Sequence, residues 1–147
     1  MTAYRTVVVG TDGSDSSFRA VDRAASIAGT DAKLIVASAY LPQHQNGRAA
    51  DVLKDESYKV SGTAPIYAIL HDTKERAHQA GAKNVEERSI EGAPVDALVN
   101  LAEEVNADLL VVGNVGLSTI AGRLLGSVPA NVSRRAKVDV LIVHTTP

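Results

Sequence analysis

A glycine-rich group of residues follows an apolar stretch at positions 109–112, and its composition and spacing suit the binding of an anion. The residues concerned are Gly113, Asn114, Gly116, Gly126, Ser127 and Val128. Glycines between a strand and a helix let the backbone approach a ligand and turn its N–H groups toward it. Ser127 takes an N-cap position and Pro129 a first-turn position of a predicted helix over about 128–136. The positive end of that helix dipole would face the anion.

The first 40 residues read as strand, helix, strand. The run from Tyr4 to Gly10 is apolar enough for a buried strand, and turn-forming residues follow it: Thr11, Asp12, Gly13 and Ser14. Apolar residues three or four apart then predict a helix ending at Ala28, and a second strand runs from Ala32 to Tyr40. Such a unit predicts two parallel strands joined by a right-handed crossover.

The rest of the chain continues the alternation of helices and strands. Helices are predicted from Thr63 to Ala80 and from Pro94 to about Val105, and strands at Asn84–Glu91, Leu109–Val112 and Val138–His144. The charged Asn84–Glu91 segment suits an edge strand. The Leu41–Gly62 segment has no clear pattern, and we interpret it as a mobile lid or a short amphipathic helix.

This order of elements predicts an α/β fold, a doubly wound, Rossmann-like parallel sheet of five strands in the order 3-2-1-4-5. Ligands bind such sheets where the strand order reverses, here between the first and fourth strands. The Gly10–Gly13 turn and the Gly113–Gly116 loop therefore meet at one crevice. Asp12 would bind ribose hydroxyls or a metal between phosphates there, or else cap the helix alongside Ser14.

Composition restricts the classes of function. A chain of 147 residues fits a single domain, 1–147, and its net charge of −2 argues against a nucleic-acid binder. With no cysteine there is no disulfide and no zinc–thiolate site. Neither a signal peptide nor a membrane span is recognisable, so we expect a cytoplasmic protein. Aromatic residues make up only 3%, which argues against a flavin site.

The spacing Gly113-x2-Gly116-x9-Gly126-Ser127 is similar to the signature of the ATP-binding universal stress proteins. The resemblance covers the whole chain, including the Gly10–Ser14 turn and the closing strand. It implies the fold shared with the adenine nucleotide alpha hydrolases and an adenine nucleotide in the crevice, with Ala39 beside the adenine ring. It also implies a homodimer formed through Val138–Val143, and an apolar edge strand predicts the same because a bare edge would aggregate.

The loop also indicates which nucleotide to expect. It lacks the Lys of a phosphate-binding P-loop, and no cationic residue lies between Gly113 and Gly122. Many family members carry a basic or hydroxyl residue where this chain has Asn114 and Val115. Cyclic AMP or AMP is therefore slightly favoured over ATP, whose charge would need Mg²⁺, with Asp12 as a metal contact.

The resulting hypothesis is a nucleotide sensor or buffer in stress signalling, with no catalytic residue assigned. The alternative is a slow metal-dependent ATPase or an autophosphorylating protein. Two other modules fit less well. A flavodoxin-like module would need a better flavin phosphate loop than Thr11–Ser14, and a response regulator would need a Lys after the fifth strand, which is absent. The four histidines, at positions 44, 71, 78 and 144, are interpreted as surface or capping residues.

Overall fold

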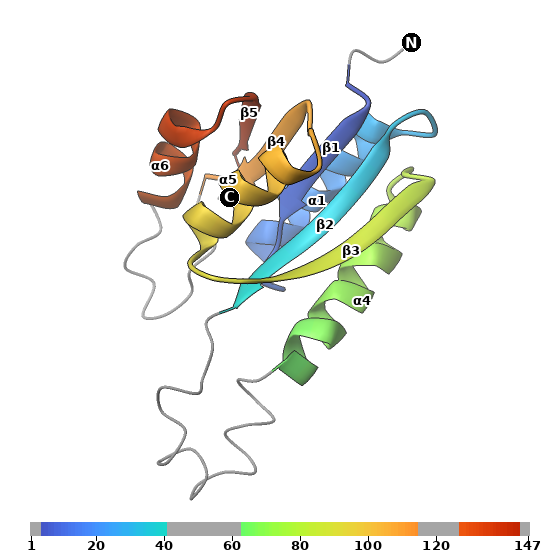
Figure 1. The fold of residues 1–147 in the computed structure, drawn as a ribbon. Coiled ribbons are helices and arrows are strands. Elements are labelled where there is room, and N and C mark those ends of the chain that lie inside the picture. Colours follow the sequence, from blue (N-terminus) through green and yellow to red (C-terminus); the bar gives the residue numbers. More distant parts are fainter. Residues whose placement is uncertain (1–3, 41–62, 115–126, 145–147) are drawn as a thin grey trace, which may run out of the picture.

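The structure, a computed structural model, describes residues 4–40, 63–114 and 127–144, with side chains described from residue 66 in the second range and from residue 130 in the third. Its helices and strands alternate along the chain (Figure 1). In chain order they are β1 (Thr6–Gly10), α1 (Asp15–Ala28), β2 (Lys33–Tyr40), α4 (Thr63–Gln79), β3 (Asn84–Glu91), α5 (Pro94–Glu104), β4 (Leu109–Gly113), α6 (Ser127–Arg135) and β5 (Asp139–Val143). The segment 41–62 and its predicted lid lie outside the described residues.

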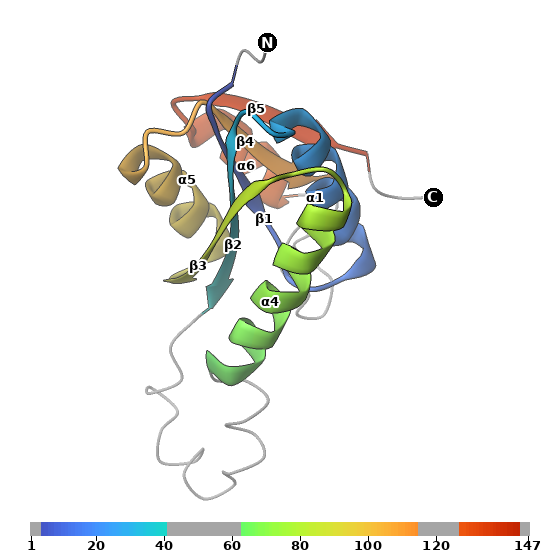
Figure 2. The ribbon, with the colours of Figure 1, turned by 90° about the vertical axis from the view of Figure 1, so that its right-hand side faces the viewer.

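The five strands are parallel and lie in the order β3-β2-β1-β4-β5, which confirms the predicted fold class and strand order. The register pairs Gly10 with Ala37 on one side of β1 and Val9 with Val111 on the other. Helices cover both faces of this sheet: α5 lies on one side of it, and α1 and α4 lie on the other (Figure 2).

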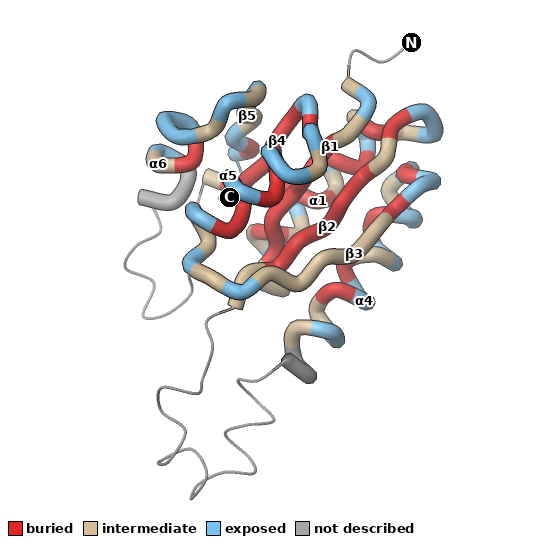
Figure 3. The backbone as a smooth tube through the Cα atoms, viewed as in Figure 1, coloured by how far each residue is buried: buried red, intermediate tan, exposed pale blue. Residues whose placement is uncertain are grey.

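The core has two halves, one on each face of the sheet. Successive residues of a strand point to opposite faces, so Val7 and Val9 pack toward α1 and α4, whereas Val8 packs toward α5 and α6. The three central strands β1, β2 and β4 are buried on both faces, which explains their continuous apolar runs (Figure 3). Full burial of one such valine contributes about 1.5–3 kcal/mol.

Helices α1 and α6 begin next to the candidate crevice. Helix α1 begins after Ser14, whose side chain accepts a hydrogen bond from the Ser17 N–H, and ends at Gly29, where φ is 55°. Helix α6 begins at Ser127, one residue before the predicted start. Because each helix runs antiparallel to the strands, both N-termini lie at the carboxyl edge of the sheet.

The last strand differs from its prediction. It is shorter than the predicted 138–144, and two of its five residues are exposed. Ile142 is 42% exposed, and Asp139 is exposed at its start.

Candidate functional site

The crevice lies at the carboxyl ends of β1 and β4, the two neighbouring strands from which the chain departs to opposite faces of the sheet. After β1 the chain enters α1, on the face of Val7 and Val9, and after β4 it leads to α6, on the face of Val8. The structure thus brings Gly10 and Gly113, each the last residue of its strand, to the same edge of the sheet.

The turn after β1 is held by its own hydrogen bonds. Thr11 is 2% exposed, its N–H donates to the Ala37 carbonyl at 2.9 Å, and its hydroxyl lies 3.0 Å from that of Ser17. The Gly13 N–H donates to Thr11 Oγ1 at 3.1 Å. Gly13 has a φ of 84°, and a Cβ there would lie 3.1 Å from the side chain of Ile69 on α4. Glycine is therefore required at this position for both its conformation and its closeness to α4.

The two carboxylate oxygens of Asp12 lie in different environments. Oδ1 accepts a hydrogen bond from the Ser14 N–H at 2.9 Å. Oδ2 is buried, and no donor among the described residues reaches it. A buried carboxylate oxygen without a donor is energetically costly, and such groups in native proteins call for an explanation. A ligand hydroxyl, an amine or a metal ion would each satisfy Oδ2.

Every backbone N–H group of the Thr11–Ser14 turn already donates within the protein, so none is left for a phosphate. The N–H groups of Thr11, Asp12, Gly13 and Ser14 donate, respectively, to Ala37 O, Ser17 Oγ, Thr11 Oγ1 and Asp12 Oδ1. The turn therefore presents an acceptor rather than an anion cradle. A phosphate would have to find its donors in the loop that follows β4.

The described part of the second loop is its beginning. Gly113 is buried and Asn114 is half-buried. The Asn114 N–H donates to the Val143 carbonyl at 2.8 Å, and its side-chain amide lies 3.4 Å from His144 Nδ1. His144 was not predicted to lie next to the loop. Their contact follows from the register of β4 and β5. This register pairs Gly113 with Val143, so the residues that follow them, Asn114 and His144, also lie side by side.

Ala39 lies close to the end of β2, beyond the point where β1 stops. The β1–β2 ladder ends at the Gly10–Ala37 pair, and the Ala37 carbonyl bonds to Thr11. Backbone groups two residues apart in a strand point to the same side. The N–H and C=O of Ala39 therefore point to the same side as those of Ala37, but β1 has already ended there and does not pair with them. The edge of a flat ligand could meet the N–H as a donor and the C=O as an acceptor.

The remaining predicted residues are less completely described. Gly116 and Gly126 lie outside the described residues, and Ser127 and Val128 form the first turn of α6 with no side chain described. Among the residues that the structure describes, no group of three or more His, Asp or Glu is arranged to hold a metal ion. No helix in the described ranges combines the length and apolar character needed to cross a bilayer.

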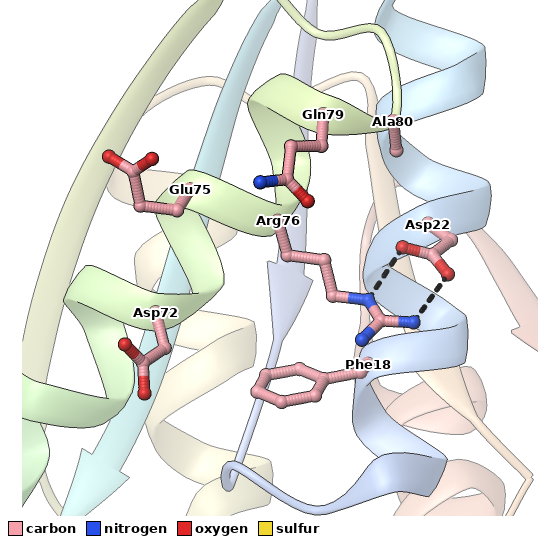
Figure 4. A pocket seen from close by; sticks show the side chains of 7 residues that line it. All are labelled: Phe18, Asp22, Asp72, Glu75, Arg76, Gln79 and Ala80. Carbon is pink, nitrogen blue, oxygen red and sulfur yellow. Dashed lines mark hydrogen bonds and ion pairs between the residues drawn. The ribbon is translucent and has the colours of Figure 1, made fainter.

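A groove of about 830 Å³ lies away from this crevice, between the outer sides of α1 and α4 (Figure 4). Arg76, the arginine among the described residues that line it, donates through Nε and Nη2 to the two carboxylate oxygens of Asp22 at 2.9 and 3.0 Å. The guanidinium also lies 5.1 Å from the centre of the Phe18 ring. Asp72 and Glu75 complete the charged lining, so the groove does not suit an anion such as a nucleotide.

Comparison with known proteins extends over almost the whole chain. Residues 3–144 match the Universal stress protein family. The chain is 87% identical over 146 residues to universal stress protein Rv1636 of Mycobacterium tuberculosis, covering 99% of this chain and all of that protein.

Solved structures agree with this match. A universal stress protein crystallised in complex with cAMP is 73% identical, with a TM-score of 0.78 and coverage of 99% of this chain and 100% of the other. The universal stress protein of Archaeoglobus fulgidus in complex with dAMP has the same fold at 22% identity, with a TM-score of 0.69 over 95% of this chain and 97% of the other. On the family match and the 87% identity, the chain belongs to the universal stress protein family.

Proposed function

We propose that this protein binds an adenine nucleotide in the crevice between β1 and β4 and acts as a nucleotide sensor or buffer in the stress response. The observation that carries the proposal is the buried Oδ2 of Asp12, which lacks a donor among the described residues. A ribose hydroxyl supplies such a donor, and Mg²⁺ bound to ATP would supply a cation instead.

The other parts of the nucleotide find suitable chemistry nearby. The N–H and C=O of Ala39 offer one donor and one acceptor, the pair that the edge of an adenine ring needs. The phosphate would be held by the loop and helix start comprising Gly113, Asn114, Gly116, Gly126, Ser127 and Val128, because the amides of the Thr11–Ser14 turn are already used. Gly10, Thr11 and Gly13 shape the turn that presents Asp12.

Among adenine nucleotides we favour cyclic AMP or AMP over ATP. The absence of a cationic residue between Gly113 and Gly122 leaves a triphosphate poorly neutralised, whereas one phosphate needs only N–H donors and a helix end. A relative 73% identical to this chain was crystallised with cAMP, which supports the same choice.

Calorimetric titration of the nucleotide-free protein tests the proposal. Cyclic AMP, AMP and ATP are titrated separately, ATP with and without Mg²⁺. We expect binding of cyclic AMP without a metal requirement, and weaker binding in Gly113→Ala and Gly126→Ala with the circular dichroism spectrum unchanged. A preference for ATP that depends on Mg²⁺ would overturn the nucleotide assignment and favour the slow ATPase. No binding of any of these nucleotides would overturn the function.

We further propose that residues 1–147 form one nucleotide-binding unit and that two such units associate through β5. Ile142 is one of the two large hydrophobic residues in the described ranges that are strongly exposed, and it lies on the outermost strand at this end of the sheet. A second copy would cover this apolar edge.

A further inference from the structure

The hydroxyl of Ser17, inside α1, lies at the centre of the turn that presents Asp12. Ser17 is 3% exposed. Its Oγ lies 3.0 Å from Thr11 Oγ1, accepts from the Asp12 N–H at 3.3 Å and donates to the Ser14 carbonyl at 3.0 Å. One side chain thus touches Asp12 itself and a residue on each side of it.

The hydrogen bonds around Ser17 have one consistent direction. Thr73 of α4 is fully buried and donates its proton to the Ile69 carbonyl at 2.7 Å, while its oxygen is 3.5 Å from Thr11 Oγ1, too far for a good hydrogen bond. Ser17 donates its single proton to the Ser14 carbonyl, so in the contact between the two hydroxyls Thr11 is the donor and Ser17 the acceptor. The hydroxyl protons of Thr73, Thr11 and Ser17 are each used in this order, which leaves Ser17 Oγ as an acceptor for the Asp12 N–H.

We propose that Ser17 is a positioning residue for Asp12, acting with the hydroxyl of Thr11. The inference rests on the proposed function, since it concerns the acceptor that would meet the nucleotide. Ser14 holds Oδ1 of Asp12, and Ser17 and Thr11 hold the backbone to which that carboxylate is attached. The pair keeps Oδ2 pointed in one direction before a ligand arrives, so binding does not have to order the turn.

Removal of the Ser17 hydroxyl leaves two groups without a partner. The Asp12 N–H loses its acceptor, and the Thr11 proton has no acceptor as close as Ser17 was. The turn then relaxes toward other arrangements in which Oδ2 points elsewhere. Loss of one neutral hydrogen bond of this kind corresponds to about three- to tenfold in a binding constant.

The test is a double-mutant cycle on cyclic AMP affinity. Ser17→Ala is expected to bind about three- to tenfold more weakly than the wild type. The same change made in an Asp12→Asn background is expected to have little further effect, because the oxygen being positioned is then gone. Ser26→Ala is the matched control, since Ser26 is an exposed serine on the same helix and its replacement leaves affinity unchanged.

Two results would overturn the inference. Wild-type affinity in Ser17→Ala would show that the hydroxyl does not position Asp12. An equal loss in the Asp12→Asn background would show a general structural effect instead. If Ser17→Ala does not fold, Thr11→Val is measured in the same cycle with exposed Thr30→Val as its control, and the same two results decide. Failure of the wild type to bind any adenine nucleotide would instead contradict the proposed function itself.

Discussion

At the scale of single residues, the proposed site depends on one carboxylate with two unequal oxygens. Oδ1 of Asp12 satisfies the Ser14 N–H and so has a structural role at the start of α1. Oδ2 is buried without a donor among the described residues, which lowers the stability of the nucleotide-free protein. Asp12 was predicted to be either a helix cap or a ligand contact. Oδ1 binds the Ser14 N–H, which leaves Oδ2 as the oxygen for the proposed ligand contact.

Asp12→Asn is predicted to separate stability from binding. The amide oxygen can still accept from Ser14, while the buried charged oxygen is replaced by a neutral NH₂ group. We expect the free energy of unfolding without ligand to stay the same or rise by about 1 kcal/mol, and cyclic AMP affinity to fall about tenfold or more. Urea unfolding and calorimetry measure the two quantities. Asp31→Asn, an exposed change before β2 at the other edge of the sheet, is the control and is expected to alter neither.

At the scale of elements, the edge strand β3 is joined to its neighbours by charged side chains. Glu86 on β3 lies 2.9 Å from Lys33 on β2 and 3.5 Å from Arg88. Arg88 reaches Glu104 on α5 at 2.9 Å. The hydrogen bond from Lys33 and its charge hold the pKa of Glu86 below its ordinary value of 4.5. The pattern of charge that predicted an edge strand thus also links β3 to the sheet and to a helix.

Glu86→Gln is predicted to weaken the protein at neutral pH and not in acid. A carboxyl whose pKa is lowered on folding adds stability above its ordinary pKa, and this contribution is lost as the pH falls through the lowered value. Because the Glu86 side chain is 36% exposed and screened by water, we expect a difference of only a few tenths of a kcal/mol. Urea unfolding at pH 7 and at about pH 3 measures it. Glu87→Gln, on the opposite face of the strand, is the control, and a difference that persists at the lower pH would contradict the assignment.

Most elements could be predicted because their signals are local. The apolar run of Leu109–Val112 and the alternation of strands with helices were enough for the strand order. The Ser17 network could not be predicted, since a serine in a polar helix turn has the same pattern whether its hydroxyl faces water or the Thr11 turn. The contact of Asn114 with His144 depends on the register of two strands far apart in the chain. The exposure of Ile142 could not be predicted either, because it depends on which elements pack beside β5.

At the scale of the whole molecule, the two edges of the sheet have opposite character. The β3 edge carries charged residues, which oppose pairing with another strand, whereas β5 consists of four apolar residues after Asp139. The proposed dimer therefore involves β5. Its formation would bury Ile142, while the described part of the crevice between β1 and β4 is built from a single chain.

Ile142→Lys is predicted to give a monomer that still binds nucleotide. A lysine at this exposed edge position adds a charge that two copies would have to bring together and desolvate. Sedimentation equilibrium over a range of protein concentrations measures the association, and calorimetry measures the affinity for cyclic AMP. Tyr67→Lys is the matched control, because Tyr67 on α4 is the other strongly exposed large hydrophobic residue in the described ranges, at 58%. A dimer that persists in Ile142→Lys and dissociates in Tyr67→Lys would place the interface on α4 instead of β5.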